Sequence, residues 1–388
     1  MELHKLVELE RARELIASLQ LRPPPVEHVK LYEAGWRIAA RSVVAHKDVP
    51  AVPLAAMDGY ALRSSDLKAF AALKLKGEVR PGDEPPTLGE GEAYYVNMGA
   101  PLPAGADAVA RVEATRAEGG LVKPLEPMRP GKDVIPKGEV VERGAVVVER
   151  GELVKPYKLP LLSMLGVQEL EVFKVRVGVL NVGDEVDRFD KPTGKPVIDS
   201  LSPMIMGLMR GLEPKYLGVV GDREEEIVYA IEEGLREAEA LLTIGGASAG
   251  ESDSVKRALS RAGEVLFPGV SVSVLKRGGV ALVGGKPVVA LPAQCVAAAL
   301  VFHEHFLHIL SRMVGRELRE FVRARLAEDV EVRHRMDAAY LFRLEGERAY
   351  PLRWGTGLCG ELAKADAFGV LSRGPHRAGE ELVLQRLL

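Results

Sequence analysis

The order of apolar and polar residues divides the chain into segments of different character. Residues 1–46 begin with charged and apolar positions at helical spacing, and Pro23-Pro24-Pro25 ends that pattern. Between residues 47 and 127, Gly and Pro recur between short apolar runs, as in strands joined by turns. These patterns predict an amphipathic N-terminal helix and a β-rich module. The apolar face predicted for the helix consists of Leu6, Leu9, Ala12, Leu15 and Ile16.

Residues 128–173 contain further strand-like runs and one helical pattern. The helix is expected over Tyr157–Leu165, because the following Gly166 is a residue that commonly ends helices. We expect this segment to join residues 1–46 in one discontinuous domain of helices and strands. Residues 47–127 then form a separate β-rich domain.

From Lys174 onward, fully apolar runs of strand length alternate with amphipathic helices. This alternation is typical of a parallel sheet that helices cover on both faces. Asp222 is expected to cap one of the helices, with Glu225 at the third helical position. The predicted α/β domain spans residues 174–314, and its strands are Val175–Val182, Tyr216–Val220, Ala240–Ile244 and Pro287–Leu291.

The last residues, 315–388, show two patterns. Gly315–Ala327 is rich in charge and predicts a helix, whereas the remainder alternates polar and apolar residues, as in Tyr340–Leu344. A small C-terminal β domain is therefore expected. Together the segments predict a multi-domain protein of the α/β plus β class.

Composition narrows the classes of function. The 388 residues suffice for several domains at roughly 100–200 residues each. The 52 basic and 55 acidic side chains give a net charge of -3, which provides no electrostatic footprint for nucleic acid. No apolar run reaches the ~20 residues that a bilayer requires, so no membrane partner is expected. The two cysteines, Cys295 and Cys359, are too few for a disulfide framework and fit a reducing cytoplasm.

Ligands of open parallel sheets bind at the carboxyl ends of the strands, so the residues after each strand are the candidates for a site. The first strand is followed by Gly183-Asp184-Glu185, whose carboxylates are suited to a cation, although a solvated turn is the favoured alternative. The third strand is followed by a loop of small residues, Gly245 to Asp253, which lets backbone N–H groups approach an anion. Helix capping is an equally weighted role for Asp253.

Other candidate features give weaker evidence of a function. The cluster from His303 to His308 lacks the spacing of a zinc protease motif, because Leu307 stands where a second ligand is needed, and a helix surface is the favoured interpretation. Pro292 follows the last strand and is interpreted as part of a turn. The chain contains no Walker loop, GxSxG elbow or GxGxxG fingerprint, which disfavours an unrelated nucleotide hydrolase.

Several motifs together resemble one known family. AAMDGYALR, GAPLPAGADAVARVE, the strand-end GDE, the Asp199-Ser200 step, GDREEEI and GGASAGESD occur in the order and spacing of the molybdenum insertases, MoeA and the gephyrin E domain. The resemblance covers nearly the whole chain. It implies an elongated homodimer of four-domain subunits, one domain resembling the molybdopterin adenylyltransferase, which is also an implied partner. The implied activity is insertion of molybdate, or tungstate, into adenylylated molybdopterin with release of AMP, aided by Mg²⁺.

The resemblance also assigns residues. It implies carboxylates and a lysine in catalysis, with Glu185 and Asp253 holding Mg²⁺, and a glycine loop that binds the substrate's phosphates. The implied catalytic residues are Asp58, Glu185, Asp222, Asp253 and Lys276. The implied substrate-binding residues are Gly245, Gly246, Ser248, Gly250, Asp199, Ser200 and Pro292.

Some positions depart from the family pattern. Gly279 stands where the family has a second loop lysine, and Gln294 where it has asparagine; Met98, Val182 and Leu201 also replace polar residues. These departures support an alternative hypothesis, a catalytically impaired paralogue that binds molybdopterin as a carrier or scaffold. The retained acidic residues favour the enzyme.

Overall fold

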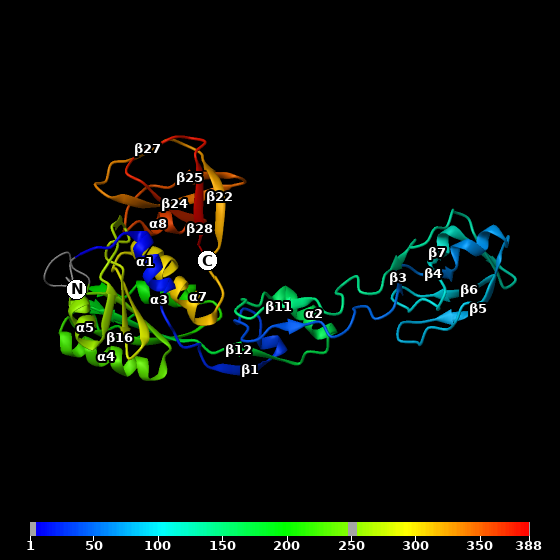
Figure 1. Cartoon of the computed structure of the whole chain (residues 1–388), viewed down its shortest axis with the longest axis horizontal. Coiled ribbons are helices and arrows are strands. Elements are labelled where there is room, and N and C mark those ends of the chain that lie inside the picture. The colour runs from blue at the N-terminus through cyan, green and yellow to red at the C-terminus, as the bar shows by residue number, and fades with distance from the viewer. Residues whose placement is uncertain (1–4, 247–253, 388) are drawn as a thin grey trace. The chain divides into compact units, whose positions relative to one another are not determined.

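A computed structural model describes residues 5–246 and 254–387. The chain forms two compact units (Figure 1). Unit 1 comprises the residues up to Arg41, Glu149–Pro156 and the residues from Glu169 onward, and unit 2 comprises Ser42–Val148 and Tyr157–Gln168. The α/β plus β fold class is confirmed. The division into four domains stays a prediction.

A six-stranded mixed sheet is the centre of unit 1. Its order is β16-β13-β17-β21-β20-β18, in which the first four strands are parallel and β20 and β18 are antiparallel to their neighbours. All four predicted strands are present, but the sheet is not wholly parallel as expected. The strands are β16 (Glu213–Val220), β13 (Arg176–Val182), β17 (Ala240–Gly245), β21 (Lys286–Leu291), β20 (Gly279–Val283) and β18 (Glu264–Phe267).

A tight hairpin explains the antiparallel part. Gly284 and Gly285 join β20 to β21, and both have positive φ, 58° and 78°. A two-residue turn of this kind matches the twist of antiparallel strands and favours glycine at both positions. The Gly-Gly pair between two apolar runs was thus the available signal for these strands.

Helices cover both faces of the sheet, as predicted. One core cluster joins the sheet to α4 and α5, and a larger cluster joins its other face to α1, α3, α6 and α7. The apolar stripe of α4 consists of Ile227, Ile231 and Leu235, all buried at helical spacing. The helices are α1 (Leu9–Ala17), α3 (Leu201–Leu208), α4 (Glu224–Glu237), α5 (Ser254–Ala262), α6 (Cys295–Val301) and α7 (Leu307–Val314).

The C-terminal residues form a closed ring of strands, and here the predicted charged helix is wrong. Phe321–Leu326 is strand β22, with Ala324 and Leu326 buried at a spacing of two while the alternating residues Arg323 and Arg325 are exposed. Alternation of this kind is a strand signal that charge content obscured. The ring consists of β22, β25 (Arg348–Pro351), β24 (Asp337–Glu345), β26 (Ala367–Leu371) and β28 (Glu381–Arg386).

Unit 2 contains the β-rich segment. Its six-stranded sheet has the order β7-β4-β6-β5-β9-β8, and β5 and β6 run parallel. Helix α2 (Leu159–Met164) confirms the helix predicted before Gly166, whose φ of 81° is the left-handed conformation expected there. The strands are β4 (Gly59–Leu62), β5 (Leu73–Val79), β6 (Glu92–Val96), β7 (Ala108–Arg111), β8 (Thr115–Glu118) and β9 (Leu121–Pro124).

Two further features qualify the composition analysis. Cys295 at the start of α6 and Cys359 in α8 (Cys359–Leu362) form a disulfide, with Cα atoms 5.8 Å apart, which the count of two cysteines did not predict. Within residues 5–246 and 254–387, no helix has the length and apolar character needed to cross a membrane.

Candidate functional site

Three strand ends meet at one edge of the unit 1 sheet. Val182, the last residue of β13, lies beside Val220 of β16 and Gly245 of β17 in the strand register. The residues that follow these three strands are therefore neighbours in space. This geometry brings Glu185, Asp222 and the Gly245-Gly246 turn to the same edge, as the sequence predicted.

Asp184 and Asp222 form a reciprocal pair at this edge, in which each carboxylate accepts a hydrogen bond from the other residue's backbone amide. The Asp184 amide donates to Asp222 Oδ2 at 3.2 Å, and the Asp222 amide donates to Asp184 Oδ1 at 3.3 Å. Gly221 makes this possible, because a Cβ there would lie 2.5 Å from Asp184 Oδ1. The reciprocal pair fixes both carboxylates at an exposed rim.

The role of Asp222 differs from the one predicted. Arg223, not Asp222, occupies the N-cap of α4, and the Arg223 side chain forms no capping hydrogen bond. Asp222 instead accepts a hydrogen bond from Ser254 Oγ, at 3.1 Å, through its second oxygen. Asp222 therefore connects the ends of β16 and β13 to the first residue of α5.

Glu185 lies over the end of β13. Its two carboxylate oxygens are 3.0 and 3.2 Å from the position that a Cβ on Gly183 would occupy, so glycine leaves room for the side chain. The residue is exposed. Among the residues that the structure describes, no hydrogen bond or ion pair engages its carboxylate, which lies at the same rim as Asp184 and Asp222.

The glycine turn after β17 requires glycine. Gly245 and Gly246 have φ of 87° and 60°, a region that other residues rarely adopt. A Cβ on Gly245 would also lie 2.5 Å from the Val182 carbonyl oxygen. The predicted residues Ser248, Gly250 and Asp253 lie outside the described residues.

Lys276 and Pro292 lie at the same edge of the sheet, next to strands β20 and β21. Since β20 is antiparallel to β21, its first residue, Gly279, pairs with Ala290 near the end of β21. The turn that carries Lys276 therefore precedes β20 at the edge where β21 ends and Pro292 follows. Pro292 is buried and Lys276 is half-buried.

Asp199 bonds within the protein. It is 2% exposed, and its oxygens accept hydrogen bonds from the Ser202 amide at 3.0 Å and the Tyr216 hydroxyl at 2.9 Å. Burial and the bond to Asp199 raise the pKa of Tyr216 well above its usual range. The adjacent Ser200 is exposed at the start of α3.

Asp58 belongs to unit 2, on the exposed turn before β4. Its Oδ1 accepts a hydrogen bond from the Met98 amide at 2.7 Å. This hydrogen bond connects two sequence motifs within unit 2, AAMDGYALR, which contains Asp58, and GAPLPAGADAVARVE, which begins directly after Met98.

The histidine cluster lies in the core, which corrects the surface interpretation. His303, Glu304 and His305 are each 1% exposed, in a π-helical turn, η5 (Phe302–Phe306), between α6 and α7. Glu304 pairs with Arg13 of α1 at 2.7 Å and with Arg319 at 3.7 Å. Burial lowers the pKa of His303 and of His305 to about 4.

Sequence reasoning missed two residues at the edge. Asp184 was noted only as a neighbour of Glu185, and Ser254 was not considered, yet both bond to Asp222. Only the register of β13 against β16 and the start of α5 reveal those contacts. In the part of the chain that the structure describes, no three His, Cys, Asp or Glu side chains form a preassembled metal cluster.

Family models match most of the chain. Residues 7–166 match the model described as "MoeA N-terminal region (domain I and II)". Residues 178–312 match the model described as "Probable molybdopterin binding domain", a range that contains the whole sheet edge.

Individual relatives agree with the models. A relative from Methanocaldococcus jannaschii, named for molybdopterin biosynthesis, is 32% identical and covers 88% of this chain and 87% of its own length. A molybdopterin molybdenumtransferase from Haemophilus influenzae is 30% identical, over 80% of this chain and 79% of its own.

Two crystal structures of MoeA from Pyrococcus horikoshii superpose with TM-scores of 0.77 and 0.79. They are 30% and 26% identical and cover 98% of this chain, with 99% and 100% of their own chains covered. Fold and site thus define a multi-domain protein with a molybdopterin-type α/β sheet. The chain belongs to the MoeA family.

Proposed function

We propose that this chain acts in molybdenum cofactor biosynthesis as a molybdopterin molybdenumtransferase. It inserts the metal of molybdate into adenylylated molybdopterin and releases AMP. The observation that carries the proposal is the sheet edge where the Asp184–Asp222 pair, Glu185 and the Gly245 turn meet, inside the range of the molybdopterin-binding model. The relative from Haemophilus influenzae that bears this enzyme name supports the activity.

The proposed mechanism begins with binding of the phosphates. The Gly245-Gly246 turn brings backbone N–H groups close to a phosphate without side-chain obstruction, near the N-terminus of α5. Lys276, on the turn before β20, is proposed to offset the charge that develops on the departing phosphate of AMP. Asp58 and Asp222 are proposed to act in catalysis with Lys276, whereas Asp199, Ser200 and Pro292 are proposed to bind the substrate.

We also propose that Mg²⁺ binds at this edge together with the substrate and neutralises the charge of its phosphates. Mg²⁺ in such sites takes one or two carboxylates together with phosphate oxygens and waters, rather than a cage of protein ligands. Glu185, with exposed oxygens over Gly183, fits that requirement, and Asp253 is the proposed second ligand. The ion would supply neutralisation of the phosphate charge.

The wider setting is also proposed. We expect a homodimer in the cytoplasm that receives its substrate from the molybdopterin adenylyltransferase. Tungstate is an alternative metal oxyanion.

The carrier hypothesis has one supporting observation. Gly279 is buried at the start of β20 and offers no cationic side chain to an oxyanion. A carrier would bind adenylylated molybdopterin without releasing AMP.

The test is AMP release by the purified protein supplied with adenylylated molybdopterin, molybdate and Mg²⁺. We expect turnover that Asp222→Asn lowers at least tenfold, because the substitution removes a negative charge from the sheet edge. Glu232→Gln is the matched control, an exposed carboxylate in the middle of α4. Binding of substrate with no AMP release would favour the carrier, and absence of both would refute the proposal.

A further inference from the structure

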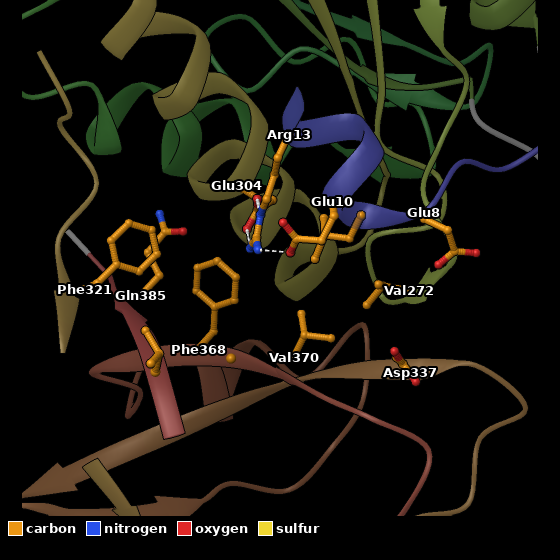
Figure 2. Close-up of a pocket in the computed structure, with 13 residues that line it drawn as sticks. Glu8, Glu10, Arg13, Val272, Glu304, Phe321, Asp337, Phe368, Val370 and Gln385 are labelled. Carbon is orange, nitrogen blue, oxygen red and sulfur yellow. Dashed lines mark hydrogen bonds and ion pairs between the residues drawn. The ribbon is translucent and has the colours of Figure 1, made fainter. Parts of the chain in front are cut away.

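A pocket separate from the sheet edge lies in unit 1 between α1 and the C-terminal ring of strands. It has a volume of about 320 Å³, which is within the usual range for small-molecule sites, roughly 300–1,000 Å³. None of the residues of the sheet edge described above lines it. Figure 2 shows its walls, with α1 and η5 on one side and strands of the ring on the other.

The charge of the pocket is negative. Its lining contains four carboxylates, against one guanidinium from Arg13. That guanidinium is already paired, with Glu10 at 2.6 Å and Glu304 at 2.7 Å. The carboxylates of Glu8 and Asp337 form no ion pair with any residue in the described ranges. Asp337 Oδ1 accepts a hydrogen bond from the Arg373 amide at 2.9 Å, which leaves its second oxygen for a ligand. Because neither Glu8 nor Asp337 has a salt-bridge partner in the described ranges, this end of the pocket is negatively charged.

A buried acceptor without a partner is the second, independent observation. Gln385 is 3% exposed, and its side-chain nitrogen donates to the His303 carbonyl oxygen at 3.0 Å. That bond fixes the amide orientation, because a flipped amide would place two oxygens in contact. Gln385 Oε1 is left with no donor among the described residues. A buried acceptor in that state is costly unless a ligand donates to it.

The two polar ends are separated by an apolar floor. In Figure 2, Glu8 and Asp337 lie at one end, Gln385 lies at the other, and Phe368 and Val370 lie between them. Phe368 of β26 is the direct cross-strand neighbour of Gln385 of β28, so the floor adjoins the unpartnered oxygen. A matching ligand has a cationic end, an aliphatic stem and a second hydrogen-bond donor.

We propose that this pocket binds a linear aliphatic polyamine. One ammonium group lies between the carboxylates of Glu8 and Asp337, the methylene groups pack on Phe368 and Val370, and a second N–H group donates to Gln385 Oε1. A bare divalent cation fits less well, since the floor is apolar and the described residues form no three-ligand metal cluster.

The test measures spermidine binding to the full-length protein by titration calorimetry in low-salt buffer, with Mg²⁺ as the competing cation. We expect saturable binding, with the dissociation constant raised about fivefold by Glu8→Gln and by Asp337→Asn. Glu347→Gln, an exposed carboxylate of the same ring outside the pocket, should leave the constant unchanged. Gln385→Met removes the acceptor and keeps the side-chain length, and should weaken binding to a similar extent.

Four outcomes would overturn the proposal. These are no saturable binding by the unmodified protein, equal affinity in the Glu8 and Asp337 variants, equal affinity in a folded Gln385→Met protein, or displacement of spermidine by Mg²⁺ at matched ionic strength. AMP release by Glu8→Gln is expected to stay at the unmodified level. Failure at this pocket is thereby separable from failure of the proposed transferase activity.

Discussion

Acidification should destabilise unit 1 through its buried histidines. His303 and His305 are each 1% exposed, and burial lowers the pKa of each ring from 6.5 to about 4. His303 Nδ1 lies 2.7 Å from the Ala299 carbonyl oxygen, whereas His305 Nε2 has no hydrogen-bond partner among the described residues. The Ala299 carbonyl favours the charged form of His303 and the Glu304 carboxylate favours that of His305, but burial outweighs both contacts and lowers each pKa.

Proton linkage gives the sign and the size of the change in the free energy of unfolding. Between pH 6.5 and 4, the unfolded chain binds protons at these rings and the folded chain does not, so falling pH favours unfolding. At 1.36 kcal/mol for each pH unit, a histidine pKa of about 4 corresponds to about 3 kcal/mol per ring lost across that interval. The contribution is fully present above pH 6.5.

Denaturant unfolding at a series of pH values measures this loss. The free energy of unfolding should fall between pH 6.5 and 4.5, and His305→Leu should flatten the fall, because it removes one titrating ring from an apolar site. His28→Gln, at an exposed histidine of β1 (Val26–Lys30), is the matched control and should leave the slope unchanged. A free energy that stays constant across this interval, or an equal slope in His305→Leu, would refute the reasoning.

Three other predictions concern stability. Gly245→Ala should cost about 1–2 kcal/mol or more, because alanine is strained at φ 87°, and urea unfolding measures it; unchanged stability would show that the turn can relax. Arg13→Ala should cost about 3 kcal/mol by leaving the buried Glu304 without its closest cation, and a thermal melt with no shift would contradict this. Reducing the disulfide between Cys295 and Cys359, 64 residues apart, should cost about 4 kcal/mol by chain entropy, checked by unfolding with and without a reductant; equal midpoints would exclude it.

Strands with wholly apolar sequences could be predicted from the chain alone. Ala240–Gly245 is buried at every position, and such runs have few alternatives to a strand inside a covered sheet. Phe321–Leu326 was misassigned because its arginines suggested a solvated helix, although the burial of Ala324 and Leu326 follows strand spacing. Charge content is a weaker guide than spacing, since an exposed strand face tolerates charge as well as a helix does.

Contacts between distant segments could not be predicted. The buried position of Glu304 depends on Arg13, which is 291 residues earlier in the chain, so local periodicity indicates only a helix with polar residues. In the same way, the sequence placed Asp222 beside a strand end but indicated a helix cap. Its bonds to Asp184 and Ser254 arise from the register of separate strands. The family resemblance located the edge, whereas the orientation of its carboxylates required the structure.

The disulfide between Cys295 and Cys359 also makes part of the chain a covalent loop. Residues 295–359 run from the start of α6 through α7 and β22 to α8. A single proteolytic cut anywhere between these cysteines leaves both fragments linked through sulfur. Such a nicked molecule would keep the mass of the intact chain, plus one water, under non-reducing conditions and would separate into two fragments only after thiol treatment.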